Sequence, residues 1–168
     1  AHIHFESSML TFTEFNRMVL PHGTTAVASD MMEISIVAGK EAIQTVLDEA
    51  SRLPVKLFYP VPSFMGDESD LQTIGAPLHP KMIEELIALP QAVGLAEVLY
   101  PPILAKSPES AHVLELAAAH GKTAEGHAPA LYGAALNAYA SAGIRSDHES
   151  TNPTEALEKL RRGIRVLM

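Results

Sequence analysis

Short apolar segments alternate with amphipathic helical patterns along most of the sequence. Residues 24–29 (TTAVAS) and 55–61 (VKLFYPV) have the composition of buried strands, and the segment 39–52 between them carries apolar residues at helical spacing. The same alternation continues, with further strands expected at 93–98, 122–126, 144–147 and 164–167. Strands separated by helices pair in parallel, so the sequence predicts an α/β protein made of βαβ units.

Helix starts are marked by capping residues. Thr11 with Glu14 forms a capping-box pattern, Ser107 precedes a first-turn proline, and Asn152 precedes Pro153 and Glu155. The helix expected after Pro129 covers 131–142. Each of these helices lies between two expected strands, as the βαβ pattern requires.

Polar residues follow the apolar segments at the carboxyl ends of the expected strands. Counting the segment at 2–4, we expect about seven parallel strands with outer helices, in repeats of roughly 20 to 35 residues. A barrel gathers all its carboxyl strand ends at one mouth, so this pattern favours an incomplete TIM-like (βα)8 barrel over a doubly wound sheet. Such a barrel has unpaired edge strands, and we therefore expect a homo-oligomer that covers them.

The composition limits the class of partner. The 168 residues carry a formal net charge of −8 without a Lys/Arg cluster, which argues against a nucleic-acid or anionic-membrane surface and favours a small-molecule partner. No run approaches the roughly 18 apolar residues of a membrane span, and a cytoplasmic enzyme is the expectation. Because the chain has no cysteine, any metal must be held by histidine and carboxylate.

His2 and His4 stand two positions apart in the first apolar segment. Residues i and i+2 of a strand point to the same side, so both imidazoles could bind one metal ion. Two histidines near a terminus could also be a tag remnant or a solvated strand end.

Three more potential ligands, Glu97, His127 and His148, lie at the ends of the later strands. In a barrel they converge with the histidine pair on one site, where a His/carboxylate set suits Zn, Mn or Fe and Glu97 could bridge two metals. The alternatives are a salt bridge at the barrel mouth for Glu97, a core histidine bonded to backbone for His127, and a solvated loop histidine for His148.

Neighbouring polar residues are candidates for substrate contact or support. Glu6, Ser7 and Ser8 follow the histidine pair closely enough to line the pocket, and Asp147 and Glu149 flank His148, where a carboxylate could orient the ring or face the substrate. The other histidines fall at helix ends or behind the barrel and are expected to be solvated: His22, His79, His112 and His120.

Five stretches resemble signature segments of the adenine deaminases of the amidohydrolase superfamily, in the same order: HIHFESSML, GLAEV, GHAP, LNAY and AGIRSDHEST. The resemblance implies a metal-dependent, deformed (βα)8 barrel with two divalent metals (Mn, Fe or Zn). His2 and His4 would hold one metal, Glu97 would bridge, and His127 and His148 would hold the second. The implied reaction belongs to purine metabolism, with water replacing the amino group of adenine to give hypoxanthine and ammonia.

The sequence departs from that family at three places. The usual Asp-Pro-His-Glu reads Asp30-Met31-Met32-Glu33, so Asp30 and Glu33 are retained as substrate-side candidates while Met32 replaces a histidine. Phe64 replaces a cysteine in a likely wall of the pocket. The family's aspartate at the eighth strand and its small flanking β-domain would lie beyond Met168, so residues 1–168 are expected to be a partial barrel with impaired activity.

Two other functions stay open at this stage. The same scaffold could cleave a cyclic amide or another aminated heterocycle, which the changes at Met32 and Phe64 would favour. Alternatively, the chain could be a non-catalytic fragment with a vestigial metal site.

Overall fold

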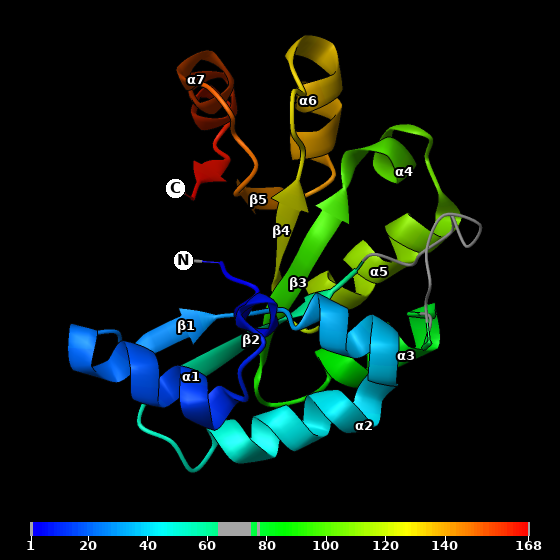
Figure 1. The fold of residues 1–168 in the computed structure, drawn as a ribbon. Helices are drawn as coiled ribbons and strands as arrows, with labels where there is room; N and C mark the ends of the chain where they lie inside the picture. The colour runs from blue at the N-terminus through cyan, green and yellow to red at the C-terminus, as the bar shows by residue number, and fades with distance from the viewer. Residues whose placement is uncertain (1, 64–74, 77, 168) are drawn as a thin grey trace.

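A six-stranded parallel sheet forms the centre of the molecule in the computed structural model, which describes residues 2–63, 75–76 and 78–167. The strands follow one another in chain order and the sheet curls, with helices around its outer side (Figure 1). Their bounds are β1 Ala26–Ala28, β2 Lys56–Pro62, β3 Ala92–Leu99, β4 Thr123–His127, β5 Ile144–Asp147 and β6 Arg165–Val166. The predicted incomplete α/β barrel is confirmed.

Helices connect successive strands. They are α1 Phe12–Val19, α2 Met32–Ala50, α3 Pro80–Ile87, α4 Tyr100–Leu104, α5 Pro108–Ala119, α6 Gly133–Ser141 and α7 Pro153–Arg161, with 3-10 turns η1 Phe5–Ser8 and η2 Leu20–His22. The predicted caps are confirmed, since the side chains of Thr11, Ser107 and Asn152 each accept a backbone N–H bond at their helix start.

Two elements differ from the sequence prediction. The strand expected around His2 is a single parallel bridge between His2 and Ala28, because the chain turns into η1 directly after His4. Helix α2 consists of two helical segments on either side of Gly39: the second agrees with the helix expected from about Gly39, whereas the first, which begins at Met32 beside Asp30, was not predicted. The Asp30 carboxylate accepts the N–H of Met32 at 3.3 Å at the start of this first segment. Gly39, with a φ of 72°, interrupts the helical geometry inside α2. In the sequence, this glycine therefore marks the start of the second helical segment.

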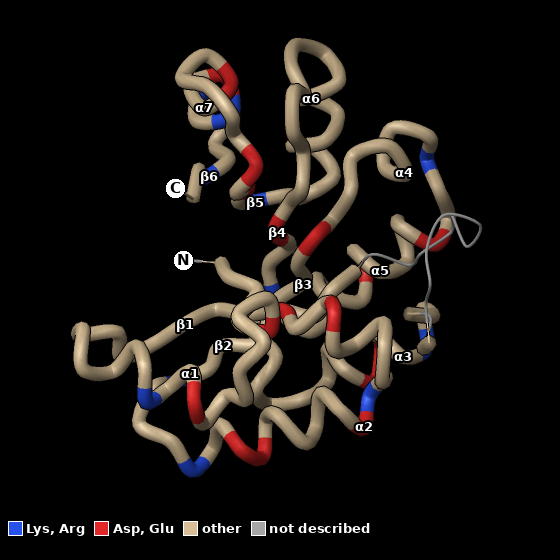
Figure 2. Tube along the Cα trace, viewed as in Figure 1, with Lys and Arg blue, Asp and Glu red and all other residues tan. Residues whose placement is uncertain are grey.

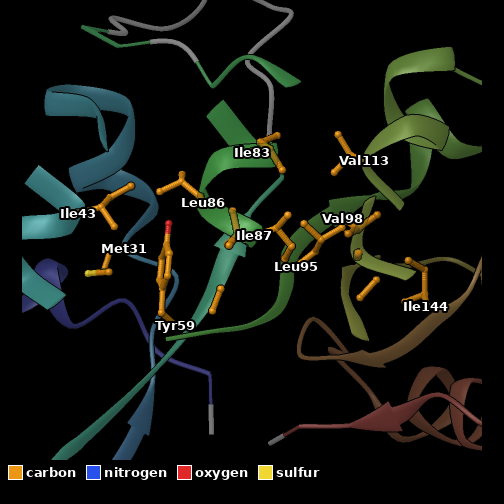
Figure 3. Close-up of a cluster of buried hydrophobic side chains, with 14 of the residues drawn as sticks. Met31, Ile43, Tyr59, Ile83, Leu86, Ile87, Leu95, Val98, Val113 and Ile144 are labelled. Carbon is orange, nitrogen blue, oxygen red and sulfur yellow. The ribbon is translucent and has the colours of Figure 1, made fainter. Parts of the chain in front are cut away.

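The hydrophobic core lies between the outer side of the sheet and the helices. Figure 3 shows side chains of α2 and α3, such as Ile43 and Leu86, packed beside residues of β2 and β3, such as Tyr59 and Leu95. Because alternate strand residues point to opposite faces, this outward packing leaves the inner face of the curled sheet for polar side chains. In the described ranges, no helix combines the length and apolar character needed to cross a membrane.

A buried tyrosine fixes the ends of two strands. The Tyr139 hydroxyl on α6 donates to the carbonyl of Val98 in β3 and accepts the N–H of His127 in β4 at 3.0 Å. Gly126 leaves the space for this hydroxyl, since a β-carbon there would collide with it. The tyrosine thus holds together the strand ends that carry Glu97 and His127.

Candidate metal centre

Glu97 lies at the centre of a group of histidines on the inner side of the sheet. It sits in a register irregularity of β3, between Leu95 and Val98, and its backbone has a φ of 56°. A positive φ is uncommon for a residue other than glycine, and such residues concentrate at functional sites. The irregularity lets Val98 enter the core while Glu97 turns to the inner side.

The four predicted histidine ligands surround this carboxylate. Oε1 of Glu97 lies 3.3 Å from Nε2 of His2, 3.7 Å from Nε2 of His4 and 3.0 Å from Nε2 of His148, while Oε2 lies 2.7 Å from Nδ1 of His127. These side chains come from the start of the chain, β3, β4 and the end of β5. The structure therefore brings together all five residues predicted as metal ligands.

Glu125 is a further member of the group that the sequence analysis did not single out. Its Oε2 lies 3.2 Å from Nδ1 of His2 and its Oε1 lies 3.4 Å from Nδ1 of His148. Glu125 stands two residues before His127 in β4, so strand alternation places both on the inner face. An E-x-H pattern within an expected strand was the available signal. Figure 2 shows acidic residues along β3 and β4 near the amino terminus.

A second carboxylate group lies on the other side of His4. Nδ1 of His4 is 3.1 Å from Asp30, which is fully buried, and 3.2 Å from Glu33, whose side chain is 45% exposed. Glu6 follows in η1, where its carboxylate accepts the hydroxyl of Ser29 at 3.4 Å. Three of the residues predicted to face substrate, Asp30, Glu33 and Glu6, therefore border the histidine group.

Many polar atoms in this region are buried and form no regular hydrogen bond, although several of them lie close to an oppositely charged group. They are His4 Nδ1, Glu6 Oε1, Asp30 Oδ2, Glu33 Oε2, Glu97 Oε1, Glu125 Oε1, His127 Nδ1 and His148 Nδ1. Buried polar atoms are normally paired, and each exception calls for an explanation such as an ion. Sets of three or four of the ligand atoms lie within 4.8 Å of one another, for example in Glu97, His127 and His148. Imidazole and carboxylate donors at this spacing fit a divalent metal.

The electrostatics of the group favour bound cations. Burial by itself would lower the pKa of His2, but the contacts with Glu125 and Glu97 outweigh burial and raise it to about 9. At His148, burial likewise lowers the pKa, but the contacts with Glu125 and Glu97 outweigh burial and raise the pKa to about 10. Burial opposes ionisation of Glu97, yet the surrounding histidines hold its pKa well below the usual range. The centre thus retains negative carboxylates that attract positive charge, as protons or as metal ions.

The remaining predicted residues have other surroundings. The Asp147 carboxylate contacts the ammonium of Lys159 and accepts the backbone N–H groups of Ala128 and Glu149. Glu149 lies at the rim, with Oε1 3.6 Å from Nε2 of His148 and 4.0 Å from Nδ1 of His127. Ser7 is exposed on η1, and its N–H donates to the carbonyl of His4.

The residues outside the centre follow the sequence prediction where the structure describes them. The four histidines expected to be solvated, His22, His79, His112 and His120, are exposed. Met32 is partly buried at the start of α2, and Phe64 lies outside the described residues.

The chain matches one family model and several named proteins along its whole length. The family model described as "Amidohydrolase family" matches residues 1–168. Proteins named adenine deaminase are similar to the whole chain: those of Desulfatibacillum aliphaticivorans (44% identical over 100% of this chain), Methanocaldococcus jannaschii (42%, 99%) and Archaeoglobus fulgidus (41%, 100%). The chain spans about 30% of the length of each of these curated relatives.

Proposed function

Because the chain belongs to the amidohydrolase family, we propose that it carries the metal centre of a hydrolytic deaminase acting on adenine or a related aminopurine. The observation that carries this proposal is the Glu97 carboxylate with histidines on both of its oxygens. The adenine deaminases that resemble the whole chain supply the substrate class. In the reaction, the C–N bond to the amino group breaks, a C–O bond to water forms, and hypoxanthine and ammonia leave.

The residues divide into two sets of metal ligands. His2, His4 and Glu97 would hold one divalent ion, and Glu97, His127 and His148 would hold the second, with Glu97 shared. Zn, Mn and Fe suit this donor set. Bound metal would lower the pKa of water and polarise the ring atom under attack.

The carboxylates around the ligands provide the remaining functions. Glu149 lies at the rim beside two ligand histidines and could take a proton from water and return it to the leaving amine. The Asp147 carboxylate accepts the N–H groups of Ala128 after β4 and Glu149 after β5, and these bonds would keep the neighbouring ligands His127 and His148 in position. Burial and the neighbouring Glu33 raise the pKa of Glu6 to about 8, so a neutral Glu6 could donate a hydrogen bond to a ring nitrogen. Glu33, Asp30 and Ser7 complete the proposed substrate side.

A second candidate is hydrolysis of a cyclic amide or another heterocycle by the same centre. Met32 favours it, because a thioether at the start of α2 replaces a polar ring beside Asp30 and changes what the pocket can recognise. The metal ligands are the same in both proposals, so only an assay of the two substrate classes can distinguish them.

The test is an ammonia-release assay on a chimera, in which this chain replaces the matching segment of the Desulfatibacillum relative. We expect the chimera loaded with Mn, Fe or Zn to deaminate adenine, and Glu97→Gln in the same chimera to lose at least about 10²-fold. The isolated chain should be at least tenfold slower than the chimera. A folded, metal-loaded chimera that hydrolyses cyclic amides but not aminopurines would replace the proposal with the second candidate. One with no hydrolysis of either class would support a vestigial site.

We also propose a cytoplasmic homo-oligomer that covers the outer edges of β1 and β6. Within the described sheet, β6 has a partner on one side only, and the outer edge of β1 is paired only by the bridge between His2 and Ala28; exposed backbone edges favour pairing with another chain. A dimer or larger assembly in sedimentation at micromolar concentration is expected, and a clean monomer would contradict this proposal.

A further inference from the structure

Glu125 occupies a position between two of the histidines. Nδ1 of His2 pairs with its Oε2 at 3.2 Å in a hydrogen bond, and Nδ1 of His148 lies 3.4 Å from its Oε1. The Glu125 side chain is only 12% exposed. Each oxygen of one carboxylate therefore faces a different ring.

The two rings adopt nearly the same orientation under this carboxylate. The imidazoles of His2 and His148 are stacked, with centroids 4.1 Å apart and planes inclined by 7°. Their Nε2 atoms lie 3.3 and 3.0 Å from the same atom, Oε1 of Glu97. Glu125 and Glu97 thus contact opposite edges of the same pair of rings.

We propose that Glu125 is a positioning residue that orients His2 and His148 together, so that both present Nε2 to the metals. A neutral imidazole that binds metal through Nε2 carries its proton on Nδ1, and it usually donates that proton to a carboxylate or carbonyl. A glutamate has two acceptor oxygens and can serve two such donors. This inference rests on the proposed division of ligands, in which His2 and His148 belong to different metals.

A single carboxylate shared by His2 and His148 should couple the two metal sites, whereas two separate carboxylates would leave the sites independent. When one ion binds, its histidine becomes fixed with Nδ1–H toward Glu125, and the carboxylate is then held in place for the second ring. The two ions should therefore bind with positive coupling, and loss of Glu125 should weaken both sites.

The variant Glu125→Gln tests this proposal in the 168-residue chain. The amide keeps the shape but offers one acceptor oxygen and an N–H₂ group that cannot accept from the second ring. Zn²⁺ titration against a chromophoric chelator should show both ions bound about 10–100-fold more weakly, with the same number of ions at saturation. Glu125→Asp, which retains the charge and both acceptors, should recover part of the affinity. Glu115→Gln makes the same change at an exposed position and should stay within twofold of the parent.

A second measurement separates positioning from direct ligation. In ¹H–¹⁵N spectra of the Zn-loaded chain, His2 and His148 should be protonated at Nδ1, and Glu125→Gln should move both Nδ1–H signals upfield. Loss of one ion at saturation would make Glu125 a metal ligand and overturn the proposal, as would weakening of only one ion or unchanged affinity. If Glu125→Gln fails to fold by circular dichroism, Glu125→Asp and the Nδ1–H signals of the parent decide the question. None of these measurements uses a substrate, so a failure of the protein to deaminate adenine would not change how their results bear on Glu125.

Discussion

The metal centre and the Lys159 cluster are both buried groups of charged side chains, but their polar atoms have different surroundings. In the Lys159 cluster, the ammonium of Lys159 on α7 contacts Asp147 at 2.5 Å and Glu155 at 3.0 Å. Asp147 also accepts the N–H groups of Ala128 and Glu149, while Glu155 accepts from residues 130 and 151. The side chains of Lys159, Asp147 and Glu155 are fully buried, and their polar atoms have partners.

The metal centre is more open, since the side chains of His4, His127 and Glu33 are 27%, 31% and 45% exposed, and eight buried polar atoms of its five carboxylates and three histidines form no regular hydrogen bond. A buried polar group without a partner costs about 1–3 kcal/mol, so such a set is tolerated where another species binds. In the Lys159 cluster, one ammonium and several backbone N–H groups satisfy the two carboxylates, and these bonds connect the chain after β4, the chain after β5 and α7. The difference separates a cluster that maintains the fold from one suited to a ligand.

The largest effect should come from Lys159→Met. The change leaves Asp147 and Glu155 as buried carboxylates without their cation, which typically costs about 3–5 kcal/mol. Urea unfolding should show this loss in the free energy of unfolding, whether or not metal is present.

Arg17→Met is the matched control, because Arg17 forms an exposed ion pair with Glu14 at 3.0 Å. Exposed pairs contribute about 0–1 kcal/mol, so its unfolding should hardly change. Equal effects of the two substitutions would show that the Lys159 cluster does not stabilise the fold more than an exposed ion pair does.

A smaller effect should follow metal addition, and it should depend on the metal centre alone. Metal at 100 times its dissociation constant stabilises a protein by about 2.7 kcal/mol, and this gain should persist in Lys159→Met as long as that variant is folded. Glu97→Gln should lose the gain. A metal response retained in Glu97→Gln would place the binding site elsewhere.

The pH dependence should reverse when metal binds. Histidines with raised pKa stabilise the metal-free fold fully below pH 6.5, and this contribution is lost as pH rises through about 9 for His2 and His4 and about 10 for His148. Metal must displace these protons, so its affinity should rise with pH over the same range. Melting temperatures from pH 6 to 10, with and without Zn²⁺, should diverge. Parallel curves would contradict the assignment.

The smallest effect should come from Tyr139→Phe. Its hydroxyl connects Val98 with His127, and its loss leaves a buried carbonyl and N–H unpaired, at a cost of about 1–3 kcal/mol. Because these bonds hold the strands of Glu97 and His127, metal affinity should fall together with stability. Val113→Ala, on α5 in the core at the outer side of the sheet, should lower stability without changing metal affinity beyond twofold.

Much of the fold could be predicted because strand and helix periodicity are local properties. Thr11, Ser107 and Asn152 marked helix starts that the structure confirms. The strand predicted at 144–147 has the same bounds in β5. By contrast, periodicity did not indicate the first segment of α2, which begins at Met32 next to the buried Asp30 and ends at the kink at Gly39.

The site was predicted less completely, because its geometry depends on long-range contacts. Strand ends indicated the five ligand candidates, and alternation within β4 could also have indicated Glu125. Asp147 and His148 are neighbours, but the carboxylate of Asp147 reaches Lys159 on α7 while the ring of His148 reaches Glu97. The positive φ of Glu97 has no signature in the residues around it.

The stacking of His2 on His148 has a consequence for the order of folding. One of the rings is at position 2 and the other at position 148, so they meet only after the intervening strands have paired in sequence. Contacts between distant residues form late because of the entropy of closing the chain between them. Metal added during refolding should therefore leave the folding rate nearly unchanged and slow unfolding instead. In stopped-flow chevrons with and without Zn²⁺, a shift confined to the folding limb would show that the centre forms early.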